Sequence, residues 1–370
     1  MESSSQSGAD SGHIRRPADR LAFVDWTRGL AAVIMLQGHV FHSLTRGDLR
    51  QGDHFILSQF VGGMPPAIFL FLTGMTLAFL MDGQQRRKVA AGDRIRAALG
   101  RAGYLALLAV LFRVQLFAFG WPYGDWSSLF RVDILNAMAL GIAAMALMSV
   151  FTTLERVRLG AILGLGIAVA APIVSALDTS AIHPYLRNYF VPHLEFFGFF
   201  PWAAFLAFGM SMGSIVRLTP AAHLGQVMQW AGWVGLAAAF SAHYFSNLPF
   251  SLYAKSDFWL NSPALIFIKL GVVLIMMSFA YLWTTYAAPG WSWVRQLGTT
   301  SLLVYWVHTE LVYGRWLGAW KESLTVGQTA LMAALVIALM LGVSLAQTHW
   351  NRVREYLPLP RTRQPAAETE

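Results

Sequence analysis

The sequence predicts an all-α protein, a polytopic bundle of about ten transmembrane helices. Hydrophobic residues make up 56% of the 370 positions and charged residues only 12%, whereas a soluble domain has about 25% charged residues. Apolar segments of about 20 residues, the length that spans a bilayer, recur along the chain. Because no long polar interval separates them, we expect one membrane domain at 21–350. A disordered cytoplasmic tail at 1–20 and a cytoplasmic tail at 351–370 flank it.

Ten apolar segments are the predicted spanning helices, each close to the length that a bilayer requires. Prolines interrupt two of them, Pro65 and Pro66 in the second and Pro172 in the fifth, so nine or eleven helices stay possible. In chain order the segments are 22–43, 64–81, 101–120, 133–151, 159–177, 196–216, 228–246, 262–286, 299–317 and 326–347.

Lys and Arg gather in alternate loops, and this predicts the orientation. Arg86, Arg87 and Lys88 stand in one such loop, and short cytoplasmic loops carry an excess of these residues. Both termini are therefore expected in the cytoplasm, and the expected location is the inner (plasma) membrane of a bacterium, with membrane lipid around the chain. This distribution accounts for the net charge of +8 without a nucleic-acid partner. The absence of cysteine excludes disulfides and thiolate catalysis.

The first apolar segment carries ionisable residues, which is unusual for a membrane helix. It holds Asp25, Arg28, His39 and His42. Each such residue costs about 2.5–3.5 kcal/mol at the membrane centre, so these side chains usually face protein or a water-filled cavity. Arg28 and His39 are eleven positions apart, about three helical turns, which places them on one face roughly 16 Å apart. The four residues form one polar stripe, the pattern of a functional site.

Four stretches of the sequence form a recognisable series. Asp25-Trp26-Thr27-Arg28-Gly29 leads into a helix that reaches His39, with ten residues between Arg28 and His39. Further on, the chain reads FLFLTG at 69–74, FFPW at 199–202 followed by Gly209, and LGTTSLLVYWVH at 297–308. In this order they resemble the membrane acyltransferase-three family and the related heparan-α-glucosaminide N-acetyltransferase-like proteins.

The resemblance implies a membrane acyltransferase that takes an acyl group, most simply acetyl, from cytoplasmic acyl-CoA. The acceptor it implies is a hydroxyl or amine of an extracytoplasmic carbohydrate, with O-acylation slightly favoured over N-acylation. In the N-acetyltransferase branch the working histidine stands in the outer loop after the first helix, where this chain has only His54. His39 and His54 are therefore both candidate bases. Direct transfer and an acyl-histidine intermediate both stay open, and no oligomeric state is predicted.

The chemistry of acyl transfer suits the residues of the first segment. An attacking alcohol needs a base with a pKa near neutrality, and histidine is the side chain that has one. His39, nearer the outer end, fits this role. Arg28, nearer the cytoplasm, matches the phosphates of CoA, and Asp25 would orient it or take part in catalysis. The plainer alternatives are an i,i+3 ion pair for Asp25 and Arg28, and an interhelical hydrogen bond for His39.

Later segments supply further candidates. Ser301, Tyr305 and His308 share a helix face that would meet the first helix across a cavity, and His308 is a candidate catalytic residue. Arg96 and Arg101, in the predicted cytoplasmic loop 86–101, are candidate ligands for CoA phosphates. For Arg96 and Arg101 the plainer explanation is the charge bias of inner loops. For Asp133 it is helix capping, and for His54 solvent exposure. The candidate acceptor-binding residues are His42, Asp133 and Glu310.

No metal site is predicted, because the histidines show neither HxxxH nor HExxH spacing. The alternative function is a secondary transporter or permease for a sugar or a lipid-linked sugar, in which the buried charges would line a path. The sequence shows no internal repeat, and a transporter has no need for a base at this distance from Arg28. Both points favour the acyltransferase.

Overall fold

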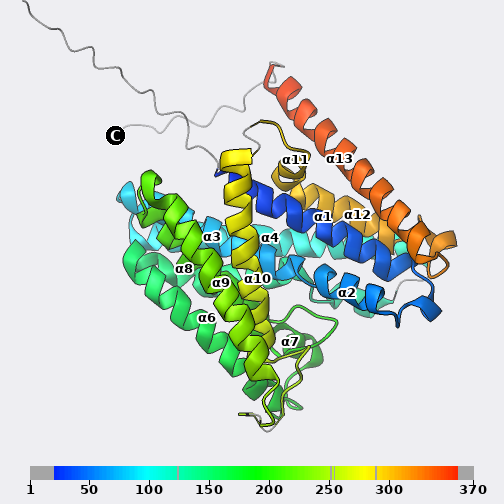
Figure 1. The fold of residues 1–370 in the computed structure, drawn as a ribbon, viewed down its shortest axis with the longest axis horizontal. Helices are drawn as coiled ribbons and strands as arrows, with labels where there is room; N and C mark the ends of the chain where they lie inside the picture. The colour runs from blue at the N-terminus through cyan, green and yellow to red at the C-terminus, as the bar shows by residue number, and fades with distance from the viewer. Residues whose placement is uncertain (1–20, 123–124, 251, 254, 288–289, 357–370) are drawn as a thin grey trace, which may run out of the picture.

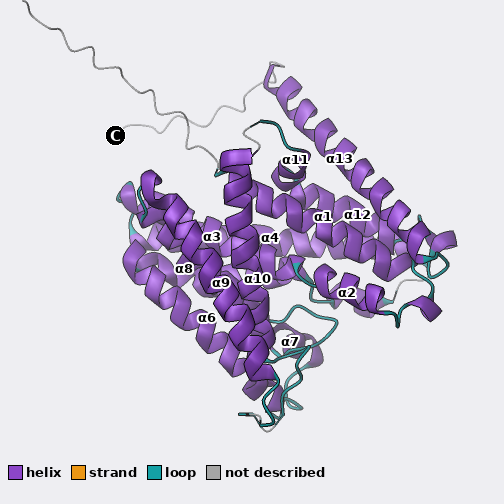
Figure 2. Ribbon diagram, viewed as in Figure 1, coloured by secondary structure: helices purple, strands orange, loops and turns teal. Residues whose placement is uncertain are grey.

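The computed structural model describes residues 21–122, 125–250, 252–253, 255–287 and 290–356. The tails predicted at 1–20 and 357–370 lie outside these residues. The described part is helical, with no strand in it (Figure 2). Its single β-bridge joins Thr45 to Leu324. The prediction of an all-α bundle is confirmed.

Each of the ten predicted segments coincides with a helix. Short helices absent from the prediction are α2 (Asp53–Gly62), α7 (Pro184–Phe190) and α11 (Trp293–Thr299). The ten are α1 (Ala22–Leu44), α3 (Pro65–Arg86), α4 (Ala91–Gly120), α5 (Ile134–Met145), α6 (Thr153–Ala176), α8 (Phe199–Leu218), α9 (Leu224–Ser246), α10 (Pro263–Leu282), α12 (Ser301–Tyr313) and α13 (Val326–Tyr356).

Seven helical stretches in the described part of the chain are long and apolar enough to cross a membrane. They contain α3, α4, α5, α6, α8, α10 and α13. The other three are α1, α9 and α12. Of these, α1 carries the polar stripe and α12 has only 13 residues. About ten helices is therefore a fair account of the bundle.

Two predicted boundaries were wrong. The loop 86–101 ends at Ala90, because α4 begins at Ala91 and carries Arg94, Arg96 and Arg101 on its first turns. This stretch is rich in alanine, which favours helix well before the chain becomes apolar. At the other end, α13 continues to Tyr356, past the predicted end of the last apolar segment at 347.

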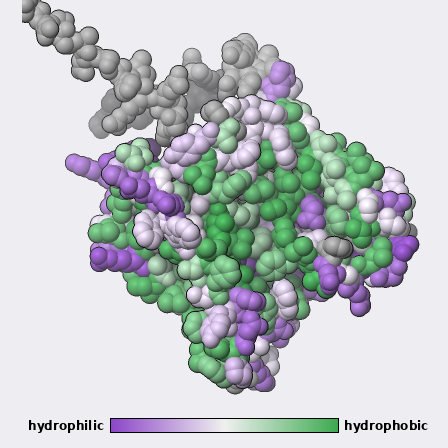
Figure 3. Space-filling model, in the orientation of Figure 1, coloured by the Kyte–Doolittle hydropathy of each residue, from purple (hydrophilic) through white to green (hydrophobic). Residues whose placement is uncertain are grey.

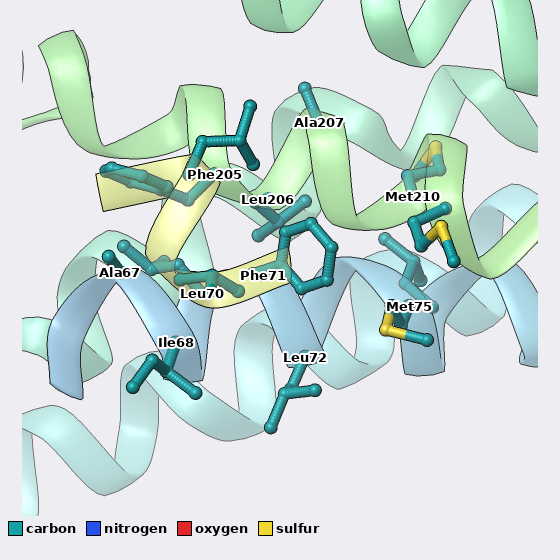
Figure 4. Close-up of a cluster of buried hydrophobic side chains, with 14 of the residues drawn as sticks. Ala67, Ile68, Leu70, Phe71, Leu72, Met75, Phe205, Leu206, Ala207 and Met210 are labelled. Atoms are coloured by element: carbon teal, nitrogen blue, oxygen red, sulfur yellow. The ribbon is translucent and has the colours of Figure 1, made fainter. Parts of the chain in front are cut away.

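The helices approach one another closely at glycines. A Cβ atom on Gly209 of α8 would lie 1.9 Å from the carbonyl oxygen of Phe71 on α3, so only glycine fits there. Figure 4 shows the side chains beside this crossing, with Phe71 and Met75 of α3 facing Leu206 and Met210 of α8. Such contacts between small residues are typical of helix packing in membranes. Similar glycine contacts join α1 to α11 at Gly29 and Gly298, and α9 to α10 at Gly235 and Gly271.

The hydrophobic core consists of two clusters, and α1 takes part in both. The larger cluster joins the first turns of α1 to α3, α5, α8 and α10. The smaller joins the rest of α1 to α11, α12 and α13, which lie alongside it (Figure 1). The bridge between Thr45 and Leu324 ties the end of α1 to the start of α13, so α1 begins and α13 ends at the same end of the bundle. Figure 3 shows a largely hydrophobic outer face, as lipid contact requires.

Candidate functional site

The structure brings His39 and His308 together, although 269 positions separate them in the sequence. His39 lies on α1, and His308 lies fully buried on α12. His39 Nδ1 is 2.8 Å from His308 Nε2, and the two rings stack with centroids 5.1 Å apart. The two histidines predicted as catalytic candidates on facing helices are thus in direct contact.

The hydrogen bonds of this pair define which nitrogens carry protons. His308 Nδ1 lies 2.6 Å from the carbonyl oxygen of Val304, one turn earlier on α12. A carbonyl oxygen only accepts, so His308 Nδ1 carries the proton, and Nε2 of the neutral ring accepts one. His39 Nδ1 therefore donates to His308 Nε2. In the neutral pair, Nε2 of His39 keeps its lone pair.

The predicted ion pair at the start of α1 is present. Arg28 Nη1 lies 3.2 Å from Asp25 Oδ1, and Asp25 is buried. The carboxylate thus holds one side of the guanidinium in place. Gly298 of α11 packs on the backbone of Asp25, so this turn of α1 sits against the junction between α11 and α12.

A cavity of about 770 Å³ opens beside this turn, lined by residues of α1, α3, α4, α5, α11, α12 and α13. Arg28 and Arg101 both line it, together with hydroxyl groups at the junction, from Thr299, Thr300 and Ser301. The Thr300 hydroxyl lies 2.6 Å from that of Ser344 on α13, which fixes the junction. The cavity combines two cations with several hydroxyl donors.

One end of the cavity approaches the histidine pair. Tyr305 and Trp306 of α12 line the cavity, and the ring of Tyr305 lies edge-on to His308, with centroids 6.0 Å apart. Of the three residues predicted to share a face, Ser301 and Tyr305 line the cavity and His308 contacts the ring of Tyr305. Arg96 does not line the cavity. Its side chain is 85% exposed and pairs with Asp93.

The three candidate acceptor residues have separate surroundings. Asp133 is buried, caps α5 through the backbone N–H groups of Leu135 and Asn136, and pairs with Arg113 at 3.2 Å. Glu310 is buried and accepts a hydrogen bond from Trp316 Nε1 at 3.2 Å. His42 is exposed at the end of α1. None of the three is among the residues that line the cavity.

Tyr313 is a neighbour of the pair that the sequence analysis missed. Its ring contacts those of both His39 and His42, with centroids 5.1 and 6.1 Å away. Tyr313 follows His308 by five residues, a spacing that does not place the two side chains on one helix face, so the sequence did not indicate this contact. The alternative base, His54, falls within α2 rather than a loop, and its side chain lies outside the described residues. Over the part of the chain described, no three histidine or acidic side chains gather as metal ligands.

Comparison with known families adds an independent finding. A family model described as heparan-alpha-glucosaminide N-acetyltransferase, catalytic, matches residues 20–246. The match runs from α1 to α9 and so includes Asp25, Arg28 and His39, whereas His308 lies beyond its end. A search of curated proteins found no match.

Proposed function

Because the chain belongs to the heparan-alpha-glucosaminide N-acetyltransferase catalytic family, we propose that it transfers acetyl from cytoplasmic acetyl-CoA to a carbohydrate across the membrane. The acceptor group is a hydroxyl or an amine, and the membrane is the inner membrane of a bacterium with both termini in the cytoplasm. The family match lends no support to the transporter alternative. The observation that carries the proposal is the hydrogen-bonded pair of His39 and His308 next to the arginine-lined cavity.

His39 is the general base in this proposal. As the acceptor oxygen or nitrogen attacks the thioester carbonyl carbon, its proton moves to Nε2 of His39. The carbon–sulfur bond then breaks, and the CoA thiolate leaves and recovers the proton from His39. General-base assistance of this kind is worth roughly 10²–10⁴ in rate.

His308 is a positioning residue. Its ring is held by the Val304 carbonyl, so it presents a lone pair to His39 Nδ1 and fixes the orientation of the base. When His39 becomes protonated, that hydrogen bond becomes charge-assisted and therefore stronger. The arrangement favours proton uptake at the moment of attack.

Arg28 and Arg101 bind the phosphates of the donor. Guanidinium groups form bidentate hydrogen bonds with phosphate oxygens, and the hydroxyls of Thr299 and Ser301 supply further donors on the same cavity. Asp25 holds Arg28 in position. His42, Asp133 and Glu310 stay predictions for the acceptor side, where the contact between His42 and Tyr313 supports His42 most directly.

The proposal is tested by acetyl transfer with full-length protein at matched membrane abundance. His39→Ala is expected to lose about 10²–10⁴ in transfer rate while CoA binding is retained. His223→Ala is the matched control, because His223 is exposed at the start of α9, and normal transfer is expected. Near-normal transfer by His39→Ala would reject the base and direct attention to His54.

A second pair of variants tests His308. His308→Leu removes the acceptor for His39 Nδ1 and should impair transfer strongly, with a changed pH profile, since the base loses its orientation. His308→Gln places an amide oxygen near the position of Nε2, so partial recovery is expected. Equal activity of the two variants would show that the hydrogen bond to His39 has no role.

A further inference from the structure

A second group of charged side chains lies away from the cavity, at the end of the bundle where α3 and α8 end and α6 begins. Asp82 of α3 is buried and is the centre of this group. Its carboxylate accepts hydrogen bonds from Thr153 at 2.8 Å, Arg86 at 2.9 Å and Arg217 at 2.7 Å. We call Asp82, Arg86, Arg94, Arg156 and Arg217 the arginine cluster.

Arg156 of α6 is the largest fully buried side chain of the described residues. Its guanidinium donates to the carbonyl oxygen of Phe151 at 2.7 Å, to Gln85 at 3.1 Å and to Thr153 at 2.9 Å. Its Nε has no hydrogen-bond partner in the described part of the chain. One donor of this buried cation is therefore unsatisfied.

Arg94 of α4 is less well satisfied than Arg156. It is 91% buried, since its exposed fraction is 9%, and its Nε and Nη1 atoms have no hydrogen-bond partner among the described residues. It lies close enough to Arg156 for the two charges to repel each other. Ser149 lies fully buried in the short helix Ala146–Val150, against which α4 packs. Its hydroxyl also has no hydrogen-bond partner among the described residues.

The charges in this region do not balance. Four arginines of the cluster face the buried carboxylate of Asp82, and the exposed carboxylate of Glu155 also attracts Arg156. The other nearby acid, Asp93, pairs with Arg96, so four cations face two carboxylates. Buried cations that lack both counter-charge and hydrogen-bond acceptors are costly. A group that is both anionic and rich in acceptors would remove both costs.

We propose that the arginine cluster binds a phosphate group, that of an anionic phospholipid. Phosphate offers negative charge and several acceptor oxygens, and it pairs with guanidinium groups in bidentate geometry. The cluster stands where a lipid headgroup would be, at an end of the transmembrane bundle, and basic pockets between membrane helices bind anionic lipids. The rim is open, because the side chains of Arg86 and Arg217 are 60% and 35% exposed.

Figure 3 agrees with this placement. Hydrophilic side chains extend from one edge of an otherwise hydrophobic face, at the edge where Figure 1 places the ends of α3 and α8. None of the five cluster residues lines the cavity that holds Arg28 and Arg101. The site thus shares no residue with the cavity of the proposed donor site, although the 3′-phosphate of CoA carries the same chemistry as a lipid phosphate.

The test measures the unfolding midpoint of the purified full chain in detergent. The probes are phosphatidylglycerol against phosphatidylcholine, and CoA against 3′-dephospho-CoA. Arg94→Gln is compared with Arg158→Gln, which removes the same charge from an exposed position two residues after Arg156. Phosphatidylglycerol should stabilise the wild type and Arg158→Gln more than phosphatidylcholine does. In Arg94→Gln the half-maximal concentration should rise about tenfold or more, because charge-assisted hydrogen bonds are lost.

Each outcome has a defined meaning. If Arg94→Gln responds to phosphatidylglycerol as Arg158→Gln does, the lipid site is overturned. If Arg94→Gln instead keeps the response to phosphatidylglycerol and loses only the stronger stabilisation by CoA than by 3′-dephospho-CoA, the cluster binds the 3′-phosphate of CoA and not a lipid. Should Arg94→Gln fail to fold, Arg94→Lys keeps the charge without the bidentate fork, and a reduced response is expected. The proposal would also be overturned if phosphatidylglycerol stabilised the wild type no more than phosphatidylcholine, and CoA no more than 3′-dephospho-CoA.

Discussion

Substituting Gly298 with alanine should force α1 and α11 apart. A Cβ atom at this position would lie 1.8 Å from the carbonyl oxygen of Asp25 and 2.8 Å from the nitrogen of Gly29. An ordinary contact begins at 3.4 Å, so the helices would have to separate by about 1.6 Å. Because both obstructing atoms belong to the backbone, no rotation of a side chain can relieve the clash. Overpacking of this kind costs about 1–3 kcal/mol and sometimes more, and we expect at least the upper value here.

Gly342→Ala provides the matched control, since a Cβ atom there would meet nothing within 4 Å. On α13 this change should be neutral or stabilising by up to about 1 kcal/mol, because alanine favours helix over glycine. The assay compares membrane abundance and the thermal unfolding midpoint of the two variants in the same detergent. Because Arg28 follows Asp25 by one turn, Gly298→Ala should also weaken CoA binding. Equal midpoints for Gly298→Ala and Gly342→Ala would refute the close approach of α1 and α11.

Two further predictions concern the donor site and the topology. Arg28→Ala should weaken CoA binding strongly and Arg28→Lys only partly, because lysine keeps the charge but loses the bidentate fork. Titration of CoA onto the purified variants measures this, and unchanged affinity in Arg28→Ala would remove the assignment. Reporter fusions at Lys88 and at the C-terminus should both report the cytoplasm, and a fusion at Asp178 the opposite side. A cytoplasmic signal at Asp178 would contradict the proposed orientation.

The bundle could be predicted because hydropathy is a local property. A run of apolar residues long enough to cross a bilayer has few folded alternatives, so all ten predicted segments coincide with helices. The errors arose where helix formation and hydropathy differ. The start of α4 at Ala91 depends on alanine content in a charged stretch, and α11 is only seven residues long. Neither feature has the length or apolar character by which a span is recognised.

The site could be predicted only in part. The ion pair between Asp25 and Arg28 follows from helix periodicity, and their place on one stripe with His39 follows from the same rule. The sequence analysis expected the face of His308 to meet the first helix across a cavity, but the direct contact between His39 and His308, 269 positions apart, depends on tertiary packing that no local pattern specifies. The sequence also could not separate Arg101, which faces the cavity, from Arg96, which faces solvent.

The packing of α1 against the last helices has a consequence for biosynthesis. Protein synthesis proceeds at about 5–20 residues per second, so His308 is made roughly 15–50 s after His39. During that interval Asp25 and Arg28 have only each other on α1 and His39 lacks His308, so the stripe is costly in lipid. The nascent first helix must therefore wait at the insertion machinery or near the interface until α11 and α12 arrive. A chain truncated after residue 246, which still contains the whole family match, would leave α1 permanently without them.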